Sequence, residues 1–184
     1  MSRIDQLLTN FRTHASQPLR RDFPLSQRIW FVVYPPEDER KLGPRLPEFE
    51  LATKDAGLEW VRVDVSGTFA EWIDSRDDKD QLMGDTELVE AYADSGYVDF
   101  IKDRLADAVA LHAQKTPERT VFALTGLMEL YDFVHVSSIL DALDSKFPGV
   151  LLVFFPGERE NNTYRFLGAR DGWDYLAVPI TPES

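Results

Sequence analysis

Charged side chains stand where two apolar segments of the chain end. The acidic residue Glu37 follows one of these segments, and Glu158 follows the other. These two carboxylates could approach each other and bind a cation, since carboxylate oxygens are ligands of hard cations. The alternative for each residue is ordinary solvation or capping of a turn. The residues that are candidates for contacting a partner are Glu37, Glu158, Arg159, Arg165 and Trp173.

The residues that usually carry catalysis do not form a recognisable site. His14, His112 and His135 lie in separate segments, and none stands three or four positions from another, so a zinc or diiron site is not indicated. There is no cysteine and no G-x-S-x-G elbow. Ser137-Ser138 lies near His135, but helix capping explains it. The sequence therefore predicts a protein with no catalytic residues, no metal and no cofactor, and not an enzyme.

The segment after the first apolar run does not have the features of a phosphate-binding loop. In such a loop, glycines and a Gly-Lys-Ser/Thr ending present backbone N–H groups and a lysine to phosphate. Here Ile29–Tyr34 leads instead into Pro35-Pro36-Glu37-Asp38-Glu39. Its two prolines have no backbone N–H to donate, and its three acidic residues would repel a phosphate. The later run Thr120–Thr125 ends at Gly126 rather than at a magnesium-binding acid. We do not expect nucleotide binding of the usual kind at this position.

The elements that must position these residues are continuous apolar runs. Ile29–Tyr34, Thr120–Thr125 and Val150–Phe155 are too short to span a membrane and too continuous for half-exposed strands, so they predict central strands of a parallel sheet. Trp60–Val65 alternates and predicts a strand nearer the edge. We expect Pro156-Gly157 to end the third central strand. After it, Tyr164–Leu167 and Tyr175–Pro179 predict a terminal hairpin, in which Trp173 covers the sheet edge or offers an aromatic contact.

Apolar residues at helical spacing predict helices between these strands. Ser2 and Asp5 form a capping-box pattern at the first helix, and Thr68 and Glu71 repeat it further on. Arg76–Asp85 is polar enough to be a loop. Other predicted helices are Arg45–Ala56, a long one after Thr86 interrupted at Ser95-Gly96, and one through Val136 to Phe147. The prediction is one α/β domain over residues 1–184, with three layers and a mostly parallel sheet flanked by helices, like a P-loop-type fold without a Walker motif.

The net charge of the chain limits the kinds of partner that it can bind. The 184-residue chain has a formal charge of −12, which opposes attraction to a phosphate backbone, so direct nucleic-acid binding is not expected. The segment Glu71–Asp103 holds eleven acidic and three basic residues, a net charge of −8. It is either a solvated helical face or a docking surface for a basic partner.

The chain has no features of a secreted or membrane protein. It has no apolar stretch after Met1 and no run of 18 apolar residues, and its lack of cysteine fits a reducing compartment. We expect a cytoplasmic protein without membrane contact.

The ordered set of short motifs resembles the BrxB family of the bacterial BREX phage-exclusion systems. The C-terminal signature is carried by Phe154-Phe155-Pro156-Gly157-Glu158 and Tyr164-Arg165-Phe166-Leu167-Gly168. The start MSRIDQLLTNF agrees with it, as does the segment Tyr34 to Glu39. Leu124-Thr125-Gly126 ahead of a helix with Ser137 to Leu140 completes the set.

This resemblance implies a non-catalytic interaction component of a BREX-like antiphage complex. It also implies a PglZ-like protein of the alkaline-phosphatase superfamily as the direct partner, together with the other BREX components. The alternative is an enzyme or switch that binds a nucleotide or another small molecule at the carboxyl ends of the central strands. A small ligand should raise the melting temperature of such a protein, whereas a protein that only binds other proteins should show no change.

Overall fold

The core of the structure is a parallel sheet. The computed structural model describes residues 1–20, 22–112, 116–130, 133–141, 143, 146–167, 173–174 and 176–183. Within this part, the parallel strands lie in the order β2-β3-β4-β1-β7. The strands are β1 (Ile29–Tyr34), β2 (Glu59–Asp64), β3 (Thr120–Thr125), β4 (Val150–Glu160), β5 (Thr163–Phe166), β6 (Trp173–Asp174) and β7 (Val178–Ile180).

The predicted fold class, α/β with a mostly parallel sheet between helices, is confirmed. β1 and β3 have the predicted bounds, and with β4 they form the centre of the sheet. β2 lies at one edge, where its alternating pattern had placed it. All neighbouring pairs among these strands are parallel, so the carboxyl ends of β1 and β4 meet at the same edge of the sheet.

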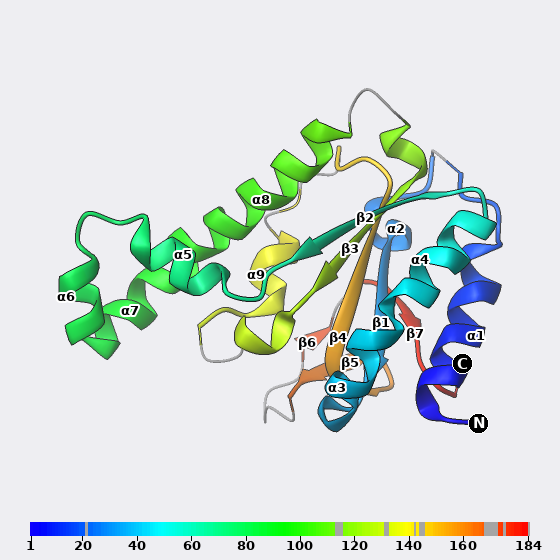
Figure 1. The fold of residues 1–184 in the computed structure, drawn as a ribbon, viewed down its shortest axis with the longest axis horizontal. Helices are drawn as coiled ribbons and strands as arrows, with labels where there is room; N and C mark the ends of the chain where they lie inside the picture. Colours follow the sequence, from blue (N-terminus) through cyan, green and yellow to red (C-terminus); the bar gives the residue numbers. More distant parts are fainter. Residues whose placement is uncertain are drawn as a thin grey trace.

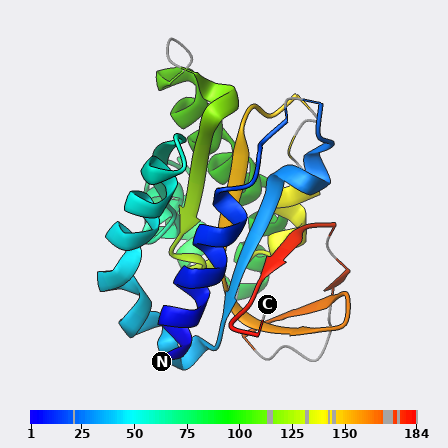
Figure 2. The ribbon, with the colours of Figure 1, turned by 90° about the vertical axis from the view of Figure 1, so that its right-hand side faces the viewer.

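Helices cover both faces of the sheet (Figures 1 and 2). The first helices, α1 and α4, lie on one face, whereas α8 and α9 lie on the other. The described helices are α1 (Arg3–Ala15), α2 (Leu25–Arg28), α3 (Glu39–Leu42), α4 (Leu46–Asp55), α5 (Thr68–Asp74), α6 (Lys79–Gly84), α7 (Thr86–Tyr92), α8 (Val98–Leu111) and α9 (Val136–Asp141). Among them none is long and apolar enough to cross a membrane.

Successive side chains of β1 enter two separate apolar clusters. Phe31 and Val33 pack with the α8 and α9 side, while Trp30 and Val32 pack with α1 and α4. Each fully buried apolar side chain contributes about 1.5–3 kcal/mol. A strand buried on both faces therefore has no place for polar side chains, which explains its continuous apolar sequence.

Two predictions about the last strands are wrong. β4 does not end at Pro156-Gly157 but continues to Glu160 and pairs antiparallel with β5. Pro156 stands opposite Tyr34, the last residue of β1, so its missing N–H falls where the parallel ladder ends. The second strand of the expected hairpin is also misplaced: Val178–Ile180 forms β7, parallel to β1, because Ile180 is buried in the α1 and α4 cluster. Tyr175 is outside the described residues.

Two predictions in the helical region are also wrong. The segment expected to be a loop contains α6, whose side chain Leu82 is buried in the core. Thr68 and Glu71 form no capping box; Gly67 is the N-cap of α5, with φ +73°, and its N–H donates to the carboxylate of Glu129. Both helices depend on contacts with residues distant in sequence, which local patterns do not contain. The expected interruption at Ser95-Gly96 is a π-helical turn, Ala93–Tyr97, that joins α7 to α8.

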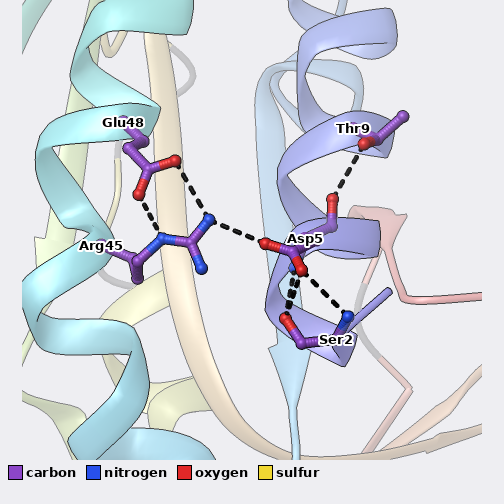
Figure 3. Close-up of polar contacts among 5 residues, drawn as sticks. All are labelled: Ser2, Asp5, Thr9, Arg45 and Glu48. Atoms are coloured by element: carbon purple, nitrogen blue, oxygen red, sulfur yellow. Dashed lines mark hydrogen bonds and ion pairs between the residues drawn. The ribbon is translucent and has the colours of Figure 1, made fainter.

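A network of polar side chains joins α1 to α4 (Figure 3). The predicted capping box of α1 is confirmed: the N–H of Asp5 donates to Ser2 Oγ at 3.2 Å, and the N–H of Ser2 donates to Asp5 Oδ2 at 2.9 Å. Arg45 Nη2 lies 2.9 Å from Asp5 Oδ1, and the same guanidinium is paired with Glu48. The Ser2 hydroxyl and Arg45 together lower the pKa of Asp5 from 3.8 to about 2.

This pKa predicts how the network depends on pH. Because the folded-state pKa of Asp5 is below its unfolded value, the stabilisation is complete above about pH 4 and is lost as the pH falls through about 2. Asp5→Asn should therefore lower the melting temperature at pH 6, and the difference from wild type should shrink at pH 2.5. Asp55→Asn is the control, since Asp55 is exposed at the end of α4 and has no ion pair within the described residues. A difference for Asp5→Asn that is the same at both pH values would contradict the assignment.

Candidate functional site

A groove of about 390 Å³ lies at the carboxyl ends of β1 and β4. The chain leaves β1 towards α4 on one face, whereas it leaves β4 towards the β5 hairpin, which packs on the other face. In open α/β sheets, ligands bind at such a point, where the connections diverge. We call it the strand-end groove; its lining is Arg3, Val33, Tyr34, Pro35, Gly157, Glu158, Arg159, Glu160, Arg165, Thr181, Pro182 and Glu183.

The β4–β5 hairpin forms one wall of the groove. Asn161 has φ +57°, a left-handed conformation that Asn tolerates better than most residues, and this turn sets the register of the two strands. Glu158 therefore stands opposite Arg165, and Arg159 stands opposite Tyr164. Tyr164 is buried while Glu158 and Arg165 are exposed, so the hairpin is anchored on its apolar face and presents charge on the other.

The turn after β1 forms the neighbouring wall, and basic side chains of α1 and α3 pair with its carboxylates. Asp38 is only 2% exposed, and its carboxylate contacts Lys41 Nζ at 2.6 Å and Arg3 Nε at 3.0 Å. The hydrogen bond from Lys41, with a further contribution from Arg3, lowers the pKa of Asp38. Glu37 Oε1 lies 3.5 Å from Arg3 Nη2. Where a phosphate-binding fold would present N–H donors, this chain holds buried or paired carboxylates.

One side chain of the central sheet is also tied to this turn. The hydroxyl of Tyr34, at the end of β1, donates to the carboxylate of Glu39. Burial, followed by the negative charge of Glu39, raises the pKa of Tyr34. Tyr34 therefore remains a neutral hydrogen-bond donor that fixes the turn against the sheet.

The structure brings together most of the residues predicted as partner contacts. Glu158, Arg159 and Arg165 line the groove, and Glu37 joins it through its ion pair with Arg3. Arg165 Nη2 lies 3.8 Å from Glu160 Oε2. Trp173 lies in β6, and its backbone pairs with that of Tyr164 in β5. The side chain of Trp173 is outside the part that the structure describes. Arg159 extends over the ring of Tyr164, 5.8 Å from its centroid.

Sequence reasoning missed two contributors to the groove. Arg3 reaches the turn from the first residue of α1, 34 positions before Glu37. The C-terminal residues Thr181 to Glu183 also line the groove, held by Asn10 Nδ2, which donates to Thr181 O at 2.7 Å. Neither contact can be predicted from a local sequence pattern. The turn residues Asn161-Asn162, by contrast, are a hairpin signal that could have placed Glu158 opposite Arg165.

The arrangement favours recognition of a polar surface over metal binding. Within the described part of the chain, no group of three or more His, Cys, Asp or Glu side chains is arranged to hold a metal ion. The hypothesis that Glu37 and Glu158 share a cation gains no support from the geometry, since the Glu37 carboxylate is engaged by Arg3. The groove instead presents alternating positive and negative side chains on a fixed hairpin.

The comparison with protein families decides the relationship of the chain. The family described as BREX protein BrxB matches residues 63–180, well over half of the chain. The chain belongs to the BrxB family. The match includes the β4–β5 hairpin and the Leu124-Thr125-Gly126 segment, whereas the two N-terminal motifs of the resemblance precede it. Searches of curated proteins and of solved structures each gave no match.

Membership in the BrxB family makes the chain a component of a BREX phage-exclusion system. Its role therefore belongs to antiphage defence, alongside the other BREX components. The hairpin with Glu158, Arg159 and Arg165 lies inside the BrxB match, whereas Arg3 and the turn after β1 lie before it.

Proposed function

We propose that this BrxB-family chain is a non-catalytic interaction component of a BREX complex, and that the strand-end groove binds a PglZ-like protein of the alkaline-phosphatase superfamily. The observation that carries the proposal is the hairpin wall: Glu158 and Arg165 stand side by side on adjacent strands, exposed at the point of the sheet where ligands dock. Alternating charges in fixed positions give specificity to a protein contact.

Two titratable side chains beside the groove, at the end of β1 and in the turn after it, support binding rather than catalysis. A general acid or base for neutral pH needs a pKa near the working pH. The pKa of Asp38 is instead lowered by Lys41 and Arg3, which keeps it a paired carboxylate. The pKa of Tyr34 is raised, which keeps its proton in place. These groups serve to fix the shape of the groove.

Charge reversal on the hairpin tests this proposal. Arg165→Glu places an acid opposite Glu158, so we expect the Kd for the purified PglZ-like protein of the same operon to rise at least about tenfold, a loss of about 1.4 kcal/mol. Isothermal titration calorimetry measures it. Lys102→Glu, on the exposed surface of α8, gives the same change of net charge away from the groove and should leave the Kd unchanged. Equal affinities for wild type and Arg165→Glu would refute the assignment of the groove.

One observation favours a second candidate function, the binding of a nucleotide or another small molecule. The groove's volume of about 390 Å³ is that of a ligand pocket, and it lies at the expected place in the sheet. Melting temperatures with ATP, GTP or magnesium discriminate the two functions. A ligand at one hundred times its Kd would stabilise the protein by about 2.7 kcal/mol. Under the interaction proposal none of the three should change the melting temperature.

A further inference from the structure

The helices α6 and α7 form an arm that extends from the rest of the molecule. Figure 1 shows them at one end of the longest axis, with α1 and both termini at the other. We call residues 79–92 the α6–α7 arm. Its attachment is well defined: Leu82 of α6 is buried in the core, Asp85 accepts a hydrogen bond from the Leu88 N–H at the start of α7, and Arg76 extends over the rings of Trp72 and Tyr92.

Two apolar side chains of the arm are exposed to solvent. Met83 is 76% exposed and Tyr92 is 42% exposed. No residue of α7 is fully buried; its apolar residues Leu88 and Val89 are half-buried and pack against the core. Surface helices normally bury a complete apolar stripe. Met83 lies outside the packed apolar side of the arm, and exposed apolar area bordered by polar residues is typical of a protein interface.

The charge on the arm indicates the chemistry of whatever covers this surface. Asp80, Glu87 and Glu90 are exposed and make no ion pair within the part of the chain that the structure describes. Lys79 is the lysine of the arm; its Nζ lies 3.6 Å from Asp74 Oδ1, so this ion pair partly neutralises its charge. The exposed side chains of the arm therefore carry a net negative charge. It repels nucleic acid and anionic membranes and is complementary to lysine and arginine side chains.

We infer that the α6–α7 arm is a second docking surface, separate from the strand-end groove, for a protein partner with basic residues around an apolar contact. Met83 and Tyr92 supply the buried centre of this interface, and Asp80, Glu87 and Glu90 supply its charged rim. Central apolar residues set the affinity of an interface, while rim charges set its association rate and salt dependence. With two surfaces at different places on the molecule, one chain can bridge two partners.

A charge-neutral variant tests the arm directly. In the arm triple variant, Asp80→Asn/Glu87→Gln/Glu90→Gln, three charges are removed with little change of shape. The control triple variant, Asp55→Asn/Glu59→Gln/Asp107→Asn, removes three exposed charges outside the arm. Both have the same net charge. Purified BREX components of the same operon are titrated one at a time against five proteins: wild type, each triple variant, Met83→Ser and Arg165→Glu. Each titration is made at 50 and at 300 mM salt. Circular dichroism confirms that each variant is folded.

We expect one component to bind wild type with strong salt dependence. For that component, the arm triple variant and Met83→Ser should each raise the Kd at least about tenfold. The arm triple variant should also weaken the salt dependence of binding. The control triple variant and Arg165→Glu should leave the Kd unchanged. Equal effects of the two triple variants, or no component sensitive to the arm, would overturn the inference. So would a dimer of wild type, seen by light scattering, that the arm triple variant dissolves, since the occupant would then be a second copy. Because Arg165→Glu is measured in the same series, failure of the groove and failure of the arm are distinguished.

Discussion

Replacement of Phe31 by alanine is expected to lower the free energy of unfolding by about 3–5 kcal/mol. Phe31 is completely buried in β1 and joins the sheet to the hairpin. Its ring stacks on that of Phe155 with centroids 5.2 Å apart, and it makes a T-shaped contact with the Tyr164 ring with centroids 5.0 Å apart. Truncation removes the transfer free energy of the ring and leaves a cavity that neighbours anchored in β-strands cannot fill. The expected loss is a large part of the 5–15 kcal/mol by which a domain is usually stable.

Urea unfolding followed by circular dichroism measures this loss. Phe31→Leu keeps most of the side-chain volume and should lose less. Leu111→Ala is the surface control, since Leu111 is 81% exposed at the end of α8, and its effect should stay within about 0.5 kcal/mol. A loss of unfolding free energy below about 1 kcal/mol for Phe31→Ala would show that the sheet and the β4–β5 hairpin do not share a core at this residue.

The success of strand prediction has the same physical origin as this effect. β1 and β3 were predicted to the residue because strands covered on both faces must be apolar at every position. β2 was placed near the edge because Arg62 and Asp64 need access to water. In these strands, burial alone determines the residue types, so the pattern can be read without knowing any contact.

The errors arose where one contact between distant residues decides the structure. α6 holds its place through Leu82, and α5 begins at Gly67 because Glu129 accepts its N–H from a distant segment. The end of β4 was misjudged because proline is a poor strand residue only when its N–H is needed, and no neighbour requires it at Pro156. Local patterns contain no information on such partners.

The candidate site was predictable only in part for the same reason. Glu158 and Arg165 were candidates because they are charged residues at a strand end and in the C-terminal signature, and the structure places them opposite each other. Arg3 closes the groove from the other end of the sequence, through ion pairs with Glu37 and Asp38 that no spacing reveals. Residues that build a site through ion pairs over long sequence separations require the fold to be known first.

Replacement of Gly157 by alanine is the second change for which we expect a large effect, and it connects the fold to the groove. An ideal Cβ at Gly157 would lie 2.1 Å from the carbonyl oxygen of Arg165 and 2.7 Å from Phe155 Cε1. The carbonyl belongs to the paired strand β5 and cannot move without breaking the ladder between β4 and β5. Overpacking of this kind costs about 1–3 kcal/mol, and more where backbone must shift.

The measurement for Gly157→Ala combines stability with partner binding. Relief of the clash by separating β5 from β4 would displace Arg165, so affinity for the PglZ-like protein should fall together with the free energy of unfolding. Gly43→Ala is the matched control: Gly43 has φ −48°, nothing lies within 4 Å of its ideal Cβ, and alanine there should be neutral or add about 0.4–1 kcal/mol. If Gly157→Ala lost stability but kept full affinity, the hairpin would not be the recognition element. If Gly157→Ala lost affinity while its stability stayed unchanged, binding would depend on the exact position of Arg165. That outcome would separate the groove's role in recognition from its role in the fold.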